Sequence, residues 1–104
     1  MKSKENLEFL PHKKYKKIFR DMRKGESIKE KEKILKYLNS FEPVLITSAK
    51  IYDAIEEVSI YNICDNVFFD GEYEWTATEK YMFEKYNVFV EHDFIDKVVG
   101  FYER

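Results

Sequence analysis

Apolar positions at the start of the chain follow helical spacing. A first helix is predicted over residues 12–24, with four apolar side chains at the i, i+3, i+4 and i+7 positions of one face: Tyr15, Ile18, Phe19 and Met22. Pro11 suits the first turn of this helix, where a backbone N–H has no partner, and Gly25 suits the position after its end. The segment therefore predicts a helix with one apolar face and basic side chains on the others.

A second helix is predicted from Ile28 to about Asn39. It begins at Ser27-Ile28-Lys29-Glu30, which has the spacing of a capping box. Pro43 prevents the helix from continuing. The side chains expected to face the core are Ile34, Leu35 and Leu38.

The middle of the chain changes to short β-rich runs. Residues 44–47 and 59–63 are predicted to be strands, being rich in Val, Ile and Tyr and too short for helices. Residues 49–58 fit either a helical period or a strand followed by a turn near Tyr52-Asp53. Both alternatives stay open for this segment.

The clearest local signal is a β-hairpin. Two β-rich arms, 66–69 and 72–75, flank Asp70-Gly71, which matches a two-residue type I′ turn because these residues tolerate positive φ. Thr76-Ala77-Thr78-Glu79 is a second capping box, so a helix is expected to follow the hairpin directly and to end near Tyr86. A last helix is predicted over residues 93–99.

Together these elements predict an α+β fold in a single domain, residues 1–104. We expect two N-terminal helices, a small and mostly antiparallel sheet with a tight Asp-Gly hairpin, and two C-terminal helices. Composition adds a charge division: residues 1–40 carry 13 Lys and Arg against 6 Asp and Glu, and residues 41–104 carry 5 against 14. The formal net charge of −2 therefore conceals a basic helical segment and an acidic sheet-and-helix part.

The remaining composition concerns compartment and chemistry. Cys64 is the only cysteine, so no internal disulfide forms, and no apolar run approaches the ~20 residues of a membrane span. We expect a cytoplasmic protein without membrane contact. The pairing of Cys64 with His92 carries no family signature, metal-ligand spacing is absent and the three glycines form no phosphate loop. The sequence thus predicts no enzyme, no metal and no cofactor.

Two charged surfaces are candidates for binding. The first combines carboxylates with aromatic anchors near the Asp-Gly hairpin and would suit a basic protein partner: Asp70, Glu72, Tyr73, Glu74, Glu79 and Tyr81. The second is the basic helix 12–24, which would attract nucleic-acid phosphates through Lys13, Lys14, Lys17, Arg20 and Arg23. The same residues could instead be a solvated face or the edge of the core.

From the hairpin onward the chain resembles small bacterial proteins of the type that accompanies toxins as immunity proteins. The shared pattern is Asp-Gly-x-Tyr-x-Trp followed by spaced Tyr, Tyr-Asn and a late Phe, over about residues 34–99. Here its positions are Asp70, Gly71, Tyr73, Trp75, Tyr81, Tyr86, Asn87 and Phe94, with Asp53 upstream. The resemblance implies a binding role and carries no catalytic residue across.

We therefore expect a protein-binding inhibitor, an immunity protein that covers the active site of a basic, nuclease-like toxin. The alternatives are a phage-encoded inhibitor of a host defence nuclease, and a small nucleic-acid-binding regulator acting through the basic helix.

Overall fold

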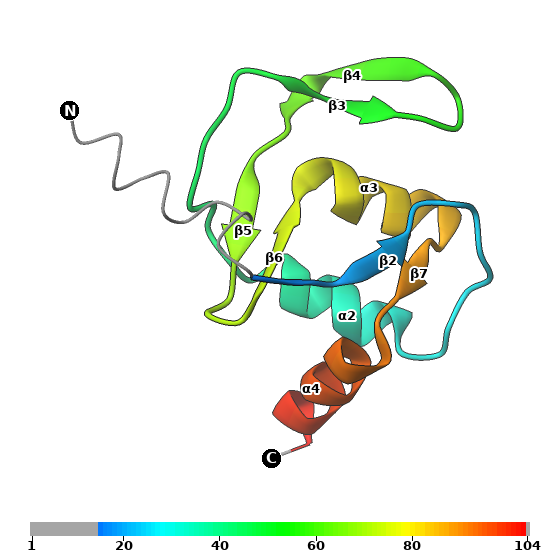
Figure 1. Ribbon diagram of the computed structural model, residues 1–104, viewed down its shortest axis with the longest axis vertical. Helices are drawn as coiled ribbons and strands as arrows, with labels where there is room; N and C mark the ends of the chain where they lie inside the picture. Colours follow the sequence, from blue (N-terminus) through cyan, green and yellow to red (C-terminus); the bar gives the residue numbers. More distant parts are fainter. Residues whose placement is uncertain (1–14, 104) are drawn as a thin grey trace.

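Three helices and seven short strands in three small sheets make up the computed structural model, which describes residues 15–103 (Figure 1). The helices are α2 (Lys31–Leu38), α3 (Ala77–Tyr86) and α4 (His92–Tyr102). The strands are β1 (Lys16–Lys17), β2 (Phe19–Asp21), β3 (Lys50–Asp53), β4 (Val58–Cys64), β5 (Val67–Phe69), β6 (Tyr73–Thr76) and β7 (Phe89–Val90).

The first sheet has β6 at its centre. β5 pairs with β6 antiparallel, with Phe68 opposite Trp75, and β1 pairs with β6 parallel, with Lys16 opposite Tyr73. The second sheet joins β2 to β7 antiparallel, with Phe19 opposite Val90. The third is the β3–β4 hairpin. Strands from the two ends of the chain thus meet in the first two sheets.

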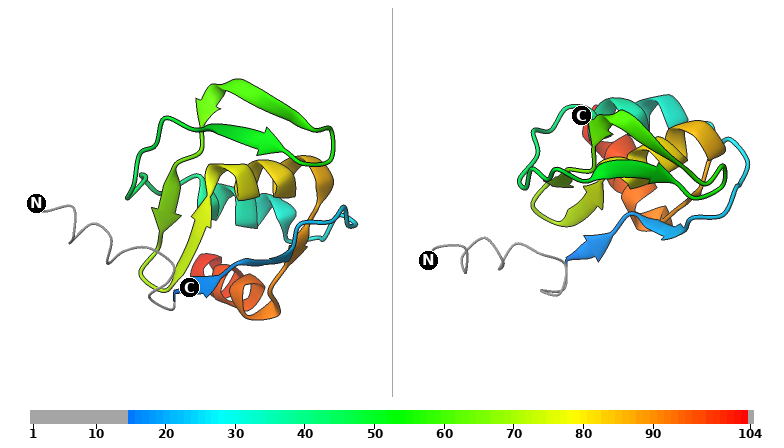
Figure 2. Two further views of the ribbon diagram at one scale, coloured as in Figure 1. Left: turned by 45° about the horizontal axis from the view of Figure 1, so that its top comes forward. Right: turned by 90° about the horizontal axis from the view of Figure 1, so that it is seen from above.

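The core lies between β6 and the three helices. Trp75 of β6, Phe83 of α3 and Phe94 of α4 are almost completely buried within one cluster, joined by Ile34 of α2 and Ile18. The β3–β4 hairpin contributes none of its residues to this cluster and lies across α3 instead, as both views of Figure 2 show. The hairpin is therefore attached to the outside of the core.

The predicted arrangement of two N-terminal and two C-terminal helices is wrong. Residues 16–21, expected in the helix over 12–24, form β1 and β2; Lys13 and Lys14 lie outside the described residues. β6 and β7, more than fifty residues away, supply the hydrogen-bonding partners. Pairing with these strands outweighs the helical period of a short segment, because tertiary contacts override local propensity.

The second helix forms, but not from its predicted cap. α2 begins at Lys31 after Glu30, which makes no side-chain cap hydrogen bond, so the capping box at Ser27 is not formed. The preceding residues follow the surface of α3, and the Gly25 N–H donates to the Tyr86 carbonyl at 3.0 Å. Gly25 therefore serves a close approach between segments and does not end a helix.

Several local predictions are confirmed. The 66–75 hairpin forms, and α3 starts with the predicted capping box between Thr76 and Glu79. Of the two alternatives left open for residues 49–58, the structure shows the strand followed by a turn. The turn is not the predicted type I′ turn at Asp70-Gly71. Phe69 pairs with Glu74 and the Asp70 N–H donates to the Tyr73 carbonyl, so the central residues are Gly71 and Glu72, and only Gly71 of these has positive φ (+103°). The Asp70 carboxylate accepts the Tyr73 N–H at 2.7 Å.

The remaining two predictions are confirmed only in part. Residues 44–47 make one isolated bridge, between Leu45 and Val67, in place of a strand. The last helix, predicted over 93–99, is longer at both ends and extends from His92 to Tyr102.

Candidate functional site

Asp70, predicted to lie on an acidic binding surface, has a fully buried side chain. Its carboxylate accepts from the Tyr37 hydroxyl at 2.7 Å and from the Lys97 ammonium at 2.9 Å. Burial alone would raise the pKa of this carboxyl, but hydrogen bonds from the Tyr73 N–H, Tyr37 and Lys97 hold the pKa below its usual range. Asp70 thus ties the hairpin turn to α2 and α4.

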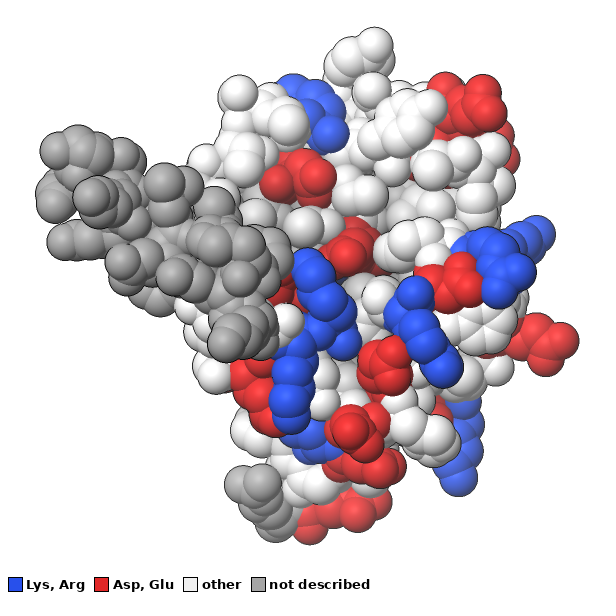
Figure 3. Space-filling model, viewed as in Figure 1, with Lys and Arg blue, Asp and Glu red and all other residues white. Residues whose placement is uncertain are grey.

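Glu72 and Glu74 are also paired within the chain. Glu72 accepts from Lys16 at 2.8 Å and Lys97 at 3.0 Å, and the hydrogen bond from Lys16 is the main reason that its pKa is lowered. Glu74 is only 1% exposed and accepts from Lys17 at 2.6 Å, while its Oε1 atom has no hydrogen-bond partner among the described residues. Figure 3 shows basic (Lys or Arg) and acidic side chains next to one another across the middle of the view.

The other members of the predicted surface are structural. Tyr73 is 3% exposed and packs edge-on against Phe94 at 5.0 Å between ring centroids. Glu79 closes the capping box of α3, and burial raises its pKa. The Tyr81 hydroxyl donates to a buried carboxylate described below. The prediction that these residues form one exposed acidic and aromatic surface is wrong, because β1 and α4 bring lysines onto the carboxylates and the core takes up the rings.

The predicted basic surface is likewise divided into pairs. Lys17 pairs with Glu74, Arg20 lies 3.4 Å from Glu91, and Arg23 bonds to Asp21 at 2.7 Å. Since the segment is not helical, these cations do not share a helix face.

Exposed apolar side chains gather elsewhere. Of the nine large hydrophobic residues exposed in the described part of the chain, seven fall within residues 44–63, on or beside the β3–β4 hairpin. Tyr61 is 80% exposed and Ile46 74%. We call this set the hairpin surface: Val44, Ile46, Tyr52, Ile55, Val58, Tyr61 and Ile63. Figure 3 shows the region over β3 and β4 as mostly uncharged.

Local sequence explains why this surface faces outward. In β3 the side chains alternate, so that Ile51 and Asp53 face α3 and Tyr52 faces away from it. β4 contains no charged residue. The register shifts between Ile51, opposite Ile60, and Lys50, opposite Cys64, which leaves residues 61–63 without a β3 partner. Such a bulge redirects side chains, here those around Tyr61.

A buried charge cluster fixes the hairpin to α3. Asp53 is 0% exposed and accepts from the Tyr86 hydroxyl at 2.6 Å and the Tyr81 hydroxyl at 2.8 Å; the Lys85 ammonium lies 3.5 Å away. The backbone amides of Ile55 and Glu56, in the hairpin turn, donate to the other oxygen. One carboxylate therefore binds both the turn and the helix.

The electrostatics of this anchor cluster follow from these bonds. Burial would raise the pKa of Asp53, but the Glu56 N–H, Tyr86 and Tyr81 hold it far below its usual range. Burial, and then the hydrogen bond to Asp53, raise the pKa of Tyr86 to about 12. The hydrogen bond to Tyr81 raises the pKa of Lys85.

The end of the hairpin is acidic. Glu56 and Glu57 lie in the turn, both exposed, and neither takes part in an ion pair within residues 15–103. Figure 3 shows acidic side chains at the end of the hairpin where the turn lies. The hairpin surface thus combines apolar side chains with unpaired carboxylates at one edge.

Two hollows adjoin these elements. A cavity of about 460 Å³ lies between β4, β5 and α3, with Ile51, Cys64 and Tyr81 in its walls. A larger groove of about 680 Å³ lies between residues 24–28 and β7, with Phe83 and Ile95 in its lining. Neither holds both Cys64 and His92, and His92 is the first residue of α4, away from the hairpin (Figure 1).

The described residues contain neither a metal-binding group nor a membrane-spanning helix. No group of three or more His, Cys, Asp and Glu side chains there is placed to hold a metal ion. None of the helices over residues 15–103 has the length and apolar character to span a bilayer.

The sequence contains a signal for the β4 strand of the hairpin, but this signal does not show that the strand is exposed. β4 is the one described strand of seven residues and has no charge, but alternation alone does not distinguish a buried strand from an exposed one.

Comparison with protein-family models, curated proteins and solved structures finds no match to this chain.

Proposed function

We propose that this chain is a protein-binding inhibitor of the immunity-protein type, and that its partner docks on the hairpin surface. The observation that carries the proposal is the gathering of seven of nine exposed large hydrophobic side chains within residues 44–63. Exposed apolar patches on small proteins mark sites of association, whereas isolated exposed hydrophobic residues do not. This patch lies outside the core, so a partner can cover it without disturbing the fold.

The residue types suit an interface. Tyr52 and Tyr61 offer rigid rings with a polar tip, the kind of side chain that dominates binding energy, and Ile46, Ile55 and Ile63 are further exposed apolar residues of the hairpin surface. The Asp53 cluster holds the hairpin against α3 before any partner arrives. Preorganisation of this kind lowers the entropy lost on binding.

Charge favours a basic partner. Glu56 and Glu57 are exposed beside Ile55 and Val58 and form no ion pair within residues 15–103, so a partner with Lys or Arg next to an apolar patch would complement them. A nuclease-like toxin, basic where it binds nucleic acid, fits this description, and covering that region would block its active site. A phage-encoded inhibitor of a defence nuclease would use the same surface.

Nothing in the structure favours the nucleic-acid-binding regulator. The cations assigned to it that the structure describes, Lys17, Arg20 and Arg23, each face a carboxylate. The proposal therefore rests on the apolar hairpin and moves the binding surface away from Glu72 and Glu74.

The test compares two baits. The chain and its Tyr61→Ser/Ile63→Ser variant are immobilised, exposed to extract of the source cells, and the protein retained by the unaltered chain is purified and titrated against both. Loss of two central apolar contacts should weaken binding by about 2–3 kcal/mol, a rise in Kd of roughly 30- to 150-fold.

Phe101→Ser is the matched control, since Phe101 is an exposed ring on α4, outside the hairpin surface. It should change Kd less than about threefold, within the range of neutral surface changes. The proposal fails if no protein is retained, or if the folded hairpin variant binds as tightly as the unaltered chain.

A further inference from the structure

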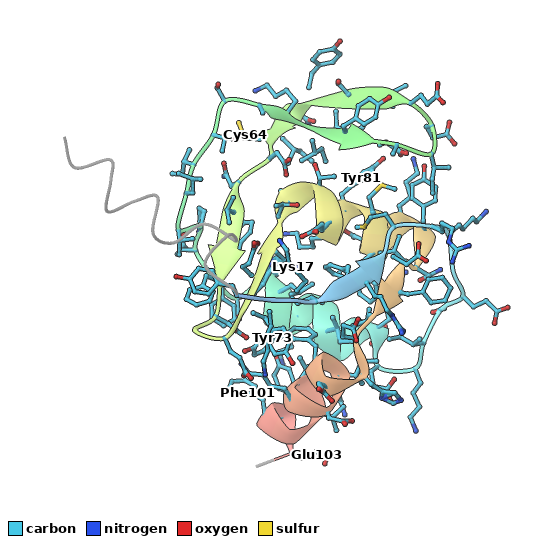
Figure 4. All side chains as sticks on the ribbon, viewed as in Figure 1. Lys17, Cys64, Tyr73, Tyr81, Phe101 and Glu103 are labelled. Atoms are coloured by element: carbon cyan, nitrogen blue, oxygen red, sulfur yellow. The ribbon has the colours of Figure 1, made fainter. Side chains whose placement is uncertain are left out.

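The cavity between the hairpin and α3 has apolar side chains on each of the elements that line it. Ile51 and Ile63 line it from the hairpin, Phe68 from β5, and Ala77 and Tyr81 from α3. Figure 4 shows Cys64 and Tyr81 on the two elements that bound this space. Its volume of about 460 Å³ falls within the range of small-ligand sites.

Three polar side chains around the cavity already have partners, whereas Asn62 and Glu84, which also line it, form no side-chain hydrogen bond within the described residues. The Lys80 ammonium donates to Asn39 at 2.6 Å, the Asn66 side-chain oxygen accepts the Thr47 N–H at 3.0 Å, and the Tyr81 hydroxyl donates to Asp53 at 2.8 Å. An occupant would therefore find few free hydrogen-bonding groups and mainly apolar contacts.

The charges in the lining cancel. Lys80 and Glu84 are one helical turn apart on α3 and are its one cation and one carboxylate among the described residues. A charged occupant would lose hydration without a net opposite charge to compensate, which is unfavourable. An uncharged, apolar occupant fits the site best.

The cavity and the hairpin surface share a residue. Ile63 is 43% exposed on that surface and also lines the cavity, so a partner that contacts Ile63 lies next to the cavity. We propose that the cavity is a socket for one large apolar side chain, aromatic or leucine-like, of the partner that binds the hairpin surface. This inference rests on the proposed function and adds the chemistry by which the partner is held.

Such a socket would account for both affinity and selectivity. Binding energy at interfaces concentrates where an anchor side chain enters a pocket that excludes water, and surrounding contacts contribute less. The carboxylates of Glu56 and Glu57 would guide a basic partner, and the socket would select those with an apolar side chain at the correct position.

The socket can be tested without the partner. N-acetyl-tryptophanamide serves as the probe and N-acetyl-lysinamide as its charged counterpart, with methyl NMR signals of Ile51 and Ile63 as the readout and those of Ile34 in the core as reference. The tryptophan amide should produce saturable shifts at Ile51 and Ile63, with Kd on the order of 1 mM, and the lysine amide none. Absence of saturable shifts with the tryptophan amide would overturn the proposal.

Filling the cavity provides the matched variants. Ala77→Met places a longer side chain into the socket, whereas Ala54→Met adds the same side chain at an exposed position of the hairpin turn. Probe binding should be lost in the first and kept in the second. As a route that does not depend on folding of a variant, Cys64, the only cysteine, can be modified in the folded protein with benzyl methanethiosulfonate, which should also abolish probe binding.

The two proposals fail differently. If the tryptophan amide does not bind while Tyr61→Ser/Ile63→Ser still loses the partner, the socket is wrong and the proposed function stands. If the amide binds and Ala77→Met prevents it, but the partner binds the hairpin variant unchanged, the partner does not use the socket and both proposals are wrong.

Discussion

At the scale of single residues, two aspartates with buried side chains each bring tyrosine hydroxyls and a lysine together. The Asp53 carboxylate accepts hydrogen bonds from the hydroxyls of Tyr81 and Tyr86 and lies near Lys85. The Asp70 carboxylate accepts hydrogen bonds from the Tyr37 hydroxyl and from Lys97. In each case tyrosine hydroxyls and a lysine satisfy a carboxylate that burial would otherwise penalise. Tyrosines and carboxylates that suggest a binding surface in the sequence thus form hydrogen bonds inside the protein that hold two hairpins in place.

Replacement of Asp53 by Asn tests the first support. The amide keeps the size but loses the charge, which leaves Lys85 unpaired and the two hydroxyls with a weaker acceptor. We expect a loss of about 2–3 kcal/mol in the free energy of unfolding, measured with urea, and faster amide exchange in β3 and β4 than in α2.

Asp96→Asn is the control, because Asp96 is an exposed aspartate on α4. Its effect should stay within about 0.5 kcal/mol. Equal losses in the two variants would show that the Asp53 cluster does not support the hairpin.

At the scale of elements, the segment between β2 and α2 decides how the N-terminal part packs. Gly25 donates to the last turn of α3, and a Cβ on Gly25 would overlap the Asn87 carbonyl oxygen. The backbone of Gly25 lies too close to that of Asn87 for a residue with a side chain at this position. The segment can therefore lie against α3 and carry β2 to β7, in place of the predicted helix.

Gly25→Ala should destabilise the fold by about 1–3 kcal/mol, since backbone has to move to relieve the overlap. Gly100→Ala is the matched change: a Cβ there meets nothing within 4 Å, and Gly100 lies inside α4, where alanine is favoured by about 0.5–1 kcal/mol. Thermal unfolding should therefore shift in opposite directions. A loss of stability with Gly100→Ala as large as with Gly25→Ala would contradict this account.

At the scale of the whole molecule, ion pairs connect the basic and acidic parts of the sequence. Lys16 pairs with Glu72, Lys17 with Glu74, and Arg20 with Glu91, each pair joining the first forty residues to the last forty. The charge division read along the sequence is therefore not a division into two faces. Within residues 15–103, the apolar side chains of the hairpin surface and the carboxylates of Glu56 and Glu57 take no part in this pairing.

Stability should depend on pH in two ranges. The pKa values of Asp53 and Asp70 are lowered in the folded protein, so their contribution is complete above the unfolded value near 4 and is lost as the pH falls below it. Burial raises the pKa of Glu79, so protonation of this residue at acid pH favours the folded state. Burial, and then hydrogen bonds to aspartate, raise the pKa of Tyr37 and Tyr86 to about 12, so stability should fall again as the pH rises from 10 to 12.

Urea unfolding at a series of pH values measures this dependence, with Asp53→Asn expected to flatten the acid limb. A stability that stays constant between pH 4 and pH 2, and between pH 10 and pH 12, would contradict the assigned hydrogen bonds.

The sequence alone determined the elements whose signals are local. The Asp70-Gly71 hairpin, the capping box from Thr76 to Glu79 and the last helix depend on residues within a few positions of one another, so their patterns are readable without the fold. The tertiary structure decided what depends on distant partners. Lys16–Asp21 became strands because β6 and β7 lie beside them, and Glu72 and Glu74 lost their availability because distant lysines reach them. An apolar strand reads the same whether a neighbour covers it or not, and only the fold left Tyr61 exposed.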